Sequence, residues 1–137
     1  MKSFRVVNMH LNIGVTNPVV RKAQLQQLLE EFLLPASREA PLVLCGDTNA
    51  CAEKPEPEMA WLSSQQDVPL VDCWEAVGDG TAGWTWDRKN PLTQSGPLLE
   101  PDQRVDVIYT SAAYFTPLGL GFSHVFTAKS CSFNAFC

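Results

Sequence analysis

The sequence predicts an α/β domain in which a helix joins two parallel strands. Apolar, β-prone residues at 4–11 and 42–45 predict the two strands. Between them, residues 18–33 carry apolar side chains at three- and four-residue steps, which indicates an amphipathic helix. A strand–helix–strand order is typical of a right-handed parallel crossover, so we expect the two strands to lie side by side in one sheet.

Both ends of the first helix carry recognisable signals. Asn17 precedes Pro18, a combination typical of a helix N-cap followed by proline at the first helical position. Pro35 predicts the end of the helix, because proline lacks the backbone N–H that a helix interior needs. Arg21 and Lys22 are expected on the solvated face of this helix.

Later segments carry weaker or more ambiguous signals. The sequence predicts a short helix at 57–64, a strand or a helix at 70–77, a short aromatic strand at 84–86 and a strong strand at 104–110. The residues from 122 onward include several aromatics but show no clear period. We therefore expect one domain over residues 1–121 and an atypical C-terminal tail over residues 122–137.

Composition excludes some classes of function. The formal net charge is −5, which argues against loose binding of nucleic acid or anionic membrane over the whole surface. A site that grips phosphate through a divalent cation remains compatible with that charge. The five cysteines form no CxxC pair, so they favour reduced thiols and a cytoplasmic or nuclear location over a zinc or redox site. No apolar run reaches the length of a transmembrane segment, and the oligomeric state is left open.

Polar side chains occur at the ends of the two parallel strands. Asp47 and Asn49 follow the second strand after Gly46, and an extended exit would point both side chains the same way. The carboxylate of Asp47 can hold a metal or orient a water, and the Asn49 amide can donate to a phosphoryl oxygen. The alternative is a strand-end turn closed by these side chains. His10 should emerge at the same edge and can donate to a phosphoryl oxygen, although alone it fits a histidine bonded to a backbone carbonyl better.

Three further residues could contribute to such a site. Arg104 and Asp106 are expected on one face of the last strong strand, where Asp106 could orient a catalytic histidine. The alternative is a surface ion pair. Trp86 could stack on a base or sugar beside a phosphate site, whereas core packing is the other role open to it and to Trp84.

Taken in order, the motifs N-M-H-L, V-L-C-G-D-T-N, V-D-C-W-E-A-V-G, W-T-W-D and R-V-D-V-I-Y resemble the endonuclease/exonuclease/phosphatase family of magnesium-dependent phosphodiesterases. The resemblance runs from about residue 4 to residue 109. Within the family, the G-D-T-N and D-x-W-E pieces are most similar to the tyrosyl-DNA phosphodiesterases that act on five-prime DNA ends. The neutral sphingomyelinases share the H-L, G-D-x-N and R-x-D pieces and stay an alternative.

The resemblance implies a fold, a reaction and a set of roles. The fold is a DNase I-like, four-layer α/β sandwich, and the reaction is hydrolysis of a phosphate ester by water attacking in line, with a DNA end or a phospholipid head group as substrate. Mg²⁺ is the implied cofactor, with Mn²⁺ as a substitute. The matching residues are Asp47 (catalytic and metal-binding), Asn49 and His10 (phosphate contacts), Asp106 (bracing the catalytic histidine), and Trp86 and Arg104 (substrate contacts).

Some family features have no match in this chain. The family's metal-proximal Asn and its Mg²⁺-ligating Glu would precede residue 1, and the closing S-D-H motif is matched only by Ser123 and His124. We therefore expect an incomplete domain with weak or absent catalysis, or a non-catalytic binding module on the same scaffold. Such a domain would expose a sheet edge and an apolar face.

Overall fold

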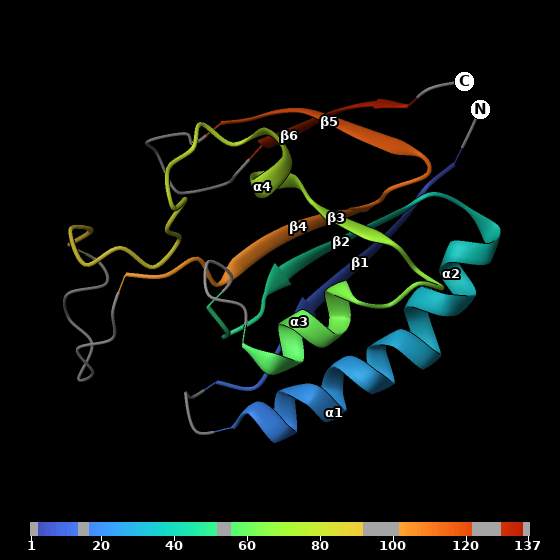
Figure 1. Cartoon of the computed structure of the whole chain (residues 1–137), viewed down its shortest axis with the longest axis horizontal. Helices are drawn as coiled ribbons and strands as arrows, with labels where there is room; N and C mark the ends of the chain where they lie inside the picture. Colours follow the sequence, from blue (N-terminus) through green and yellow to red (C-terminus); the bar gives the residue numbers. More distant parts are fainter. Residues whose placement is uncertain (1–2, 14–16, 52–55, 92–101, 122–129, 136–137) are drawn as a thin grey trace.

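The computed structural model describes residues 3–13, 17–51, 56–91, 102–121 and 130–135, and its main feature is a mixed sheet (Figure 1). Four strands lie in the order β1-β2-β4-β3, with β1 and β2 parallel and the other two pairs antiparallel. A separate antiparallel pair, β5-β6, lies beyond helix α4. The strands are β1 (Arg5–His10), β2 (Leu42–Asp47), β3 (Leu70–Asp72), β4 (Asp106–Ser111), β5 (Phe115–Gly121) and β6 (Ser130–Ala135).

Helices on one face of the sheet enclose the core. The helical elements are α1 (Pro18–Leu28), the π-helical η1 (Leu29–Leu33), α2 (Leu34–Glu39), α3 (Pro57–Ser63) and α4 (Cys73–Val77). Leu25 of α1, Leu62 of α3 and Leu44 of β2 are buried in one hydrophobic cluster, so α1 and α3 cover the same side of the sheet (Figure 1). Helix α4 instead contacts β4 and β5. Among the described residues, no helix has both the length and the apolar character needed to cross a bilayer.

The predicted crossover is confirmed, but the predicted end of its helix is wrong. β1, α1 and β2 follow one another, and β1 pairs with β2 in parallel. The helical path continues through the π turn of η1 into α2, with Pro35 in the first turn of α2. The wider hydrogen-bond ring of a π turn moves the carbonyls out of the usual register, which accommodates the missing N–H and the ring of proline.

The charged face expected for α1 is partly wrong. The Arg21 side chain is fully buried, because Glu58 is buried beside it and accepts a hydrogen bond from its Nε at 2.7 Å. Lys22 lies over the ring of Trp61, with its Nζ 4.3 Å from the ring centroid. The buried charge of Arg21 is thus matched by a carboxylate 37 positions later in the chain.

The ambiguous segments have definite structures. The helix expected at 57–64 is α3, and the segment at 70–77 is a strand followed by a helix, because Asp72 caps α4 by accepting the N–H groups of Trp74 and Glu75. The aromatic strand expected at 84–86 is reduced to one isolated bridge between Trp86 and Gln103. The last strong strand begins at Asp106.

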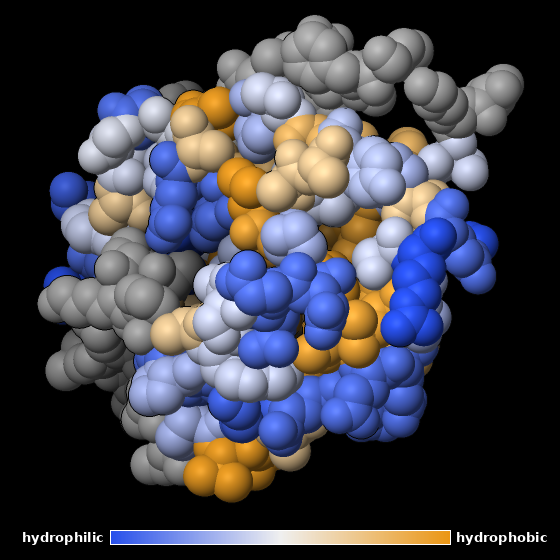
Figure 2. Space-filling model, turned by 45° about the vertical axis from the view of Figure 1, so that its right-hand side comes forward, coloured by the Kyte–Doolittle hydropathy of each residue, from blue (hydrophilic) through white to orange (hydrophobic). Residues whose placement is uncertain are grey.

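Apolar side chains reach the surface along β1, which is the edge strand of the described sheet. Phe4 and Val6 are 56% and 58% exposed, and the ring of Phe4 meets that of Phe115 edge-on. Figure 2 shows apolar side chains interrupting an otherwise polar surface. This matches the expected open edge. Within the segment expected to be an atypical tail, β6 pairs with β5.

Candidate active site

Three polar residues form a row across the sheet at the end of β2. His10 is the register partner of Asp47, and Asp47 is the register partner of Asp106. These residues end β1, end β2 and begin β4, respectively. Because β1 and β2 are parallel and β4 runs the other way, all three positions lie at the same edge of the sheet. The structure therefore brings together three of the predicted site residues, which we call the polar row.

The polar row is partly open to solvent. The His10 Nε2 and Asp47 Oδ2 atoms are 3.7 Å apart, and the side chains are 74% and 34% exposed. Partial burial of Asp47 raises the pKa of its carboxyl, and the negative charge of Asp106 adds to the rise. The N–H of Asn49 and the imidazole of His10 oppose that rise. A carboxylate with a raised pKa beside a histidine is suited to accept a proton.

The chain does not leave β2 in an extended conformation. Asn49 has a positive φ of 47°, and its backbone N–H donates to Asp47 Oδ1 at 2.8 Å. Its side-chain Nδ2 donates to the backbone oxygen of Leu11 at 2.8 Å. The extended exit was a wrong prediction, and the alternative of a strand-end turn is what the structure shows. That turn nevertheless keeps Asn49 beside the polar row.

Gly46 and Thr48 explain why the chain turns there. Gly46 has φ 138°, and a Cβ on it would lie 1.9 Å from the backbone oxygen of Met9 on the neighbouring strand. The buried Thr48 donates its backbone N–H to the Val105 oxygen at 2.8 Å, and its hydroxyl lies 2.8 Å from the same oxygen. Gly46 and Thr48 of the G-D-T-N sequence therefore have structural roles at this strand end.

Arg104 does not share a strand face with Asp106, because it precedes β4. Its side chain is buried, and its Nη1 donates to Asp72 Oδ2 at 2.8 Å. Its Nη2 lies 3.6 Å from Glu75 Oε1. Arg104 thus joins the start of β4 to α4, and a direct contact with substrate stays a prediction for this residue.

Trp86 lies in a loop that is anchored beside the polar row. It forms the isolated bridge with Gln103, and the hydroxyl of the preceding Thr85 accepts the N–H groups of Val105 and Asp106 at 3.1 and 3.0 Å. The side chain of Trp86 is partly exposed. A stacking role for Trp86 stays a prediction. Ser123 and His124 lie outside the described residues.

The polar row offers two carboxylates for a metal ion. Among the described residues, no group of three or more His, Cys, Asp or Glu side chains gathers as a metal site. Mg²⁺ usually keeps several waters and uses one or two carboxylates plus substrate oxygens. The mutual repulsion that contributes to the raised pKa of Asp47 is the kind of interaction that a cation between Asp47 and Asp106 would relieve. This donor pair fits a weakly held Mg²⁺ rather than a protein-enclosed one.

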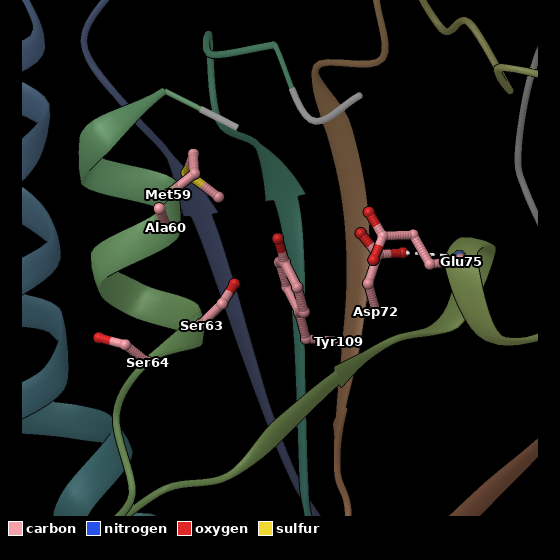
Figure 3. Close-up of a pocket in the computed structure, with 7 residues that line it drawn as sticks. All are labelled: Met59, Ala60, Ser63, Ser64, Asp72, Glu75 and Tyr109. Atoms are coloured by element: carbon pink, nitrogen blue, oxygen red, sulfur yellow. Dashed lines mark hydrogen bonds between the residues drawn. The ribbon is translucent and has the colours of Figure 1, made fainter. Parts of the chain in front are cut away.

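A pocket elsewhere in the fold was not predicted from the sequence. It has a volume of about 440 Å³ and lies between α3 and the β3–β4 pair (Figure 3). Its lining consists of Met59, Ala60, Ser63, Ser64, Asp72, Glu75 and Tyr109. Burial, with the charge of Asp72 adding to it, raises the pKa of Tyr109. Tyr109 belongs to the core that the helices cover, and none of the predicted catalytic residues lines this pocket.

Comparisons with known proteins identify the fold. No family model and no curated protein matches the sequence. The human Nocturnin catalytic domain with bound sulfate matches 97% of this chain and 48% of its own length, with a TM-score of 0.62 and 19% identity. D. rerio TDP2 complexed with a single-strand DNA product matches 96% of this chain and 56% of its own length, with a TM-score of 0.65 and 22% identity.

A third match carries the family description. An endonuclease/exonuclease/phosphatase family protein from Bacteroides thetaiotaomicron matches 95% of this chain and 46% of its own length, with a TM-score of 0.53 and 18% identity. The chain therefore spans about half the length of the solved structures that it matches. The expected architecture is confirmed: the chain has the DNase I-like α/β fold of the endonuclease/exonuclease/phosphatase proteins.

Proposed function

We propose that this chain carries the phosphate-binding side of a metal-dependent phosphoesterase site. The observation that carries the proposal is the polar row of His10, Asp47 and Asp106 at one edge of the sheet. The similarity of the fold to phosphoesterase and nuclease structures supports the same reading. A fold alone does not define a function, and the chemistry of the polar row is what supports this one.

Three residues of the site contact the attacking water or the phosphate in this proposal. Asp47 holds the attacking water and takes its proton while the water oxygen attacks phosphorus. The bond from phosphorus to the leaving oxygen on the opposite side breaks, and the leaving oxygen takes up a proton from solvent. His10, which is exposed at the edge, donates to a phosphoryl oxygen as negative charge develops. One N–H of the Asn49 amide group holds Leu11 O, and the other is the donor proposed for a second phosphoryl oxygen.

Mg²⁺, with Mn²⁺ as a substitute, is the proposed cofactor. Asp47 and Asp106 would hold it, and when bound it would supply positive charge to neutralise the phosphoryl group. Asp106 also keeps its proposed role of bracing a catalytic histidine. Because the protein supplies few ligands, we expect the affinity for the metal to depend on the bound phosphate. We also expect turnover by this chain to be weak or absent.

The proposed substrate is the five-prime end of DNA. The D. rerio TDP2 structure contains a single-strand DNA product, and Trp86 stands in a loop anchored at Asp106, where a base could stack on its ring. The net charge of −5 agrees with a contact limited to one phosphate and its neighbouring base. A phospholipid head group is the alternative, and the two substrates differ in their need for an aromatic stacking surface.

Ligand-dependent stabilisation tests the proposal without requiring turnover. The melting temperature is measured with Mg²⁺ and a five-prime-phosphorylated oligonucleotide, each alone and both together. At one hundred times the dissociation constant, binding should add about 2.7 kcal/mol to the free energy of unfolding. We expect Mg²⁺ and oligonucleotide together to raise the melting temperature of the natural chain but not of Asp47→Asn.

The matched control is Asp79→Asn, which removes a carboxylate from an exposed turn where it bonds Thr81. This variant should keep the full ligand response. The proposal is wrong if the natural chain does not respond, or if Asp47→Asn responds as strongly as Asp79→Asn. Phosphocholine in place of the oligonucleotide separates the phospholipid alternative from the DNA end.

A further inference from the structure

Helix α1 is bonded to the chain just after β1 and to the start of α3. Gln24 Oε1 accepts the backbone N–H of Asn12 at 2.8 Å, two residues after the end of β1. One turn earlier on the helix, Arg21 donates from Nε to Glu58 and from Nη2 to Glu56. Glu56 and Glu58 end the segment that leaves β2 and begin α3. Positions 21 and 24 share one helix face, so a single face of α1 is bonded to Asn12 after β1 and to the start of α3.

The loops after β1 and β2 are also bonded to each other beside the polar row. Asn49 Nδ2 donates to Leu11 O at 2.8 Å, and the Leu11 N–H donates to Asp47 O at 2.9 Å. Leu11 follows His10 directly, and Asn49 follows Asp47 by two positions. Any shift of one loop relative to the other must therefore change the placement of Asn49 against the strand ends.

Burying the charged Arg21–Glu58 pair costs more desolvation free energy than a simple packing contact would. Both side chains are buried, and Glu58 Oε2 finds no hydrogen-bond partner among the described residues. A buried ion pair rarely stabilises a fold better than apolar side chains of similar volume, but its fixed geometry can specify one arrangement over others. The geometry here specifies how the start of α3 sits against α1.

We propose that Gln24 is a positioning residue that fixes the chain after β1, and thereby the placement of Asn49 beside His10 and Asp47, while Arg21 fixes the start of α3 against the same helix face. This inference rests on the proposed function only in treating the polar row as an active site. The hydrogen-bonded link between α1 and the residues beside the polar row can be tested independently of that function. Neither residue is expected to touch substrate.

Amide hydrogen exchange measured by NMR tests the link through Gln24. In Gln24→Met the Asn12 N–H loses its acceptor, and exchange at Leu11 and Asn49 should accelerate about fivefold or more, which is the change expected from losing one hydrogen bond. Exchange at Leu44, in the centre of β2, should not change. Gln24→Glu keeps an oxygen acceptor at the same position and should restore the natural exchange rates.

The matched control is Gln27→Met on the same helix, where Gln27 bonds only the exposed Glu31 among the contacts described. It should leave the loops unchanged. Equal exchange in Gln24→Met and Gln27→Met would overturn the proposal, as would a uniform acceleration throughout the sheet, since that is the signature of a purely structural role. Failure of Gln24→Glu to restore the rates would overturn it as well.

The arm for Arg21 uses the double variant Arg21→Met/Glu58→Met, because Arg21→Met alone leaves a buried carboxylate unpaired. The double variant should fold and should still accelerate exchange at Met59 and Ala60, whose N–H groups donate to Glu56 O at the start of α3, about fivefold or more. Unchanged exchange in a folded double variant would overturn the assignment of Arg21. None of these exchange measurements requires a ligand, whereas failure of the proposed function would appear only as a missing response to Mg²⁺ and oligonucleotide.

Discussion

Replacing Gly46 with alanine should disrupt the sheet at the candidate active site. Met9 and Gly46 are register partners in the β1–β2 pair, and a Cβ at position 46 would stand 1.9 Å from Met9 O and 2.8 Å from Met9 C. Both contacts are with backbone atoms, so no side-chain rotation can relieve them. The end of β1 would have to move away from β2, which separates His10 from Asp47.

The expected cost has two parts that can be worked from the structure. A non-glycine residue at φ 138° occupies a region that is almost exclusive to glycine, at a cost of about 1–3 kcal/mol. Displacing β1 at this point weakens at least one or two ladder hydrogen bonds, at about 1 kcal/mol each. The free energy of unfolding should therefore fall by about 2–5 kcal/mol, a large fraction of the stability of a small domain.

Urea unfolding of Gly46→Ala and a matched variant, Gly80→Ala, measures this cost. Gly80 has φ 83°, but a Cβ there would meet no atom within 4 Å. Gly80→Ala should therefore lower the free energy of unfolding only through the strain of a non-glycine residue at positive φ, by about 1–2 kcal/mol. The difference between the two variants isolates the close approach of β1. Equal losses in the two variants would refute the argument that Met9 requires glycine at position 46.

Two further changes probe the same strand end. Thr48→Val should lower the free energy of unfolding by about 1–3 kcal/mol, because the buried Val105 oxygen and the Ala50 N–H both lose the hydroxyl as a hydrogen-bond partner. Thr48→Ser keeps the hydroxyl and should be destabilised less. Urea unfolding of both variants measures the difference, and equal stability of the two would contradict the prediction. Asp47→Asn should stabilise the fold more at neutral pH than at pH 3. The raised pKa of Asp47 means that the folded state binds its proton more tightly than the unfolded chain, so ionisation as pH rises is destabilising, and the amide avoids that loss. The difference in melting temperature between Asp47→Asn and the natural chain, measured across this pH range, checks the prediction. A stabilisation by Asp47→Asn that grows toward pH 3 would contradict it.

The row of His10 and Asp47 could be anticipated because it follows from local signals and one handedness rule. Apolar periods located β1, α1 and β2, and the parallel crossover placed both strand ends at the same edge. The pairing of Asp106 with Asp47 could not be predicted from such local signals. The register of an antiparallel pair depends on the geometry of the connection between its two strands.

Two of the errors arise from long-range partners, and a third arises from a local π turn. Arg21 looks like a solvated helix residue until Glu58, 37 positions later, is buried beside it. Arg104 fits a strand by its sequence pattern, yet it precedes β4 and its guanidinium is bonded to Asp72, 32 positions earlier in the chain. Pro35 obeys the rule for ending an α-helix, but that rule does not anticipate the π turn that precedes it.

Asp72 illustrates how tightly one position can be constrained. Its Oδ1 accepts the first N–H groups of α4, and its Oδ2 accepts the Arg104 guanidinium, so one short side chain ends β3, starts a helix and neutralises a buried cation. Asparagine would keep the cap but lose the charge, and glutamate would keep the charge but reach too far to cap. We therefore expect position 72 to tolerate no other amino acid without loss, even though it lies outside the polar row.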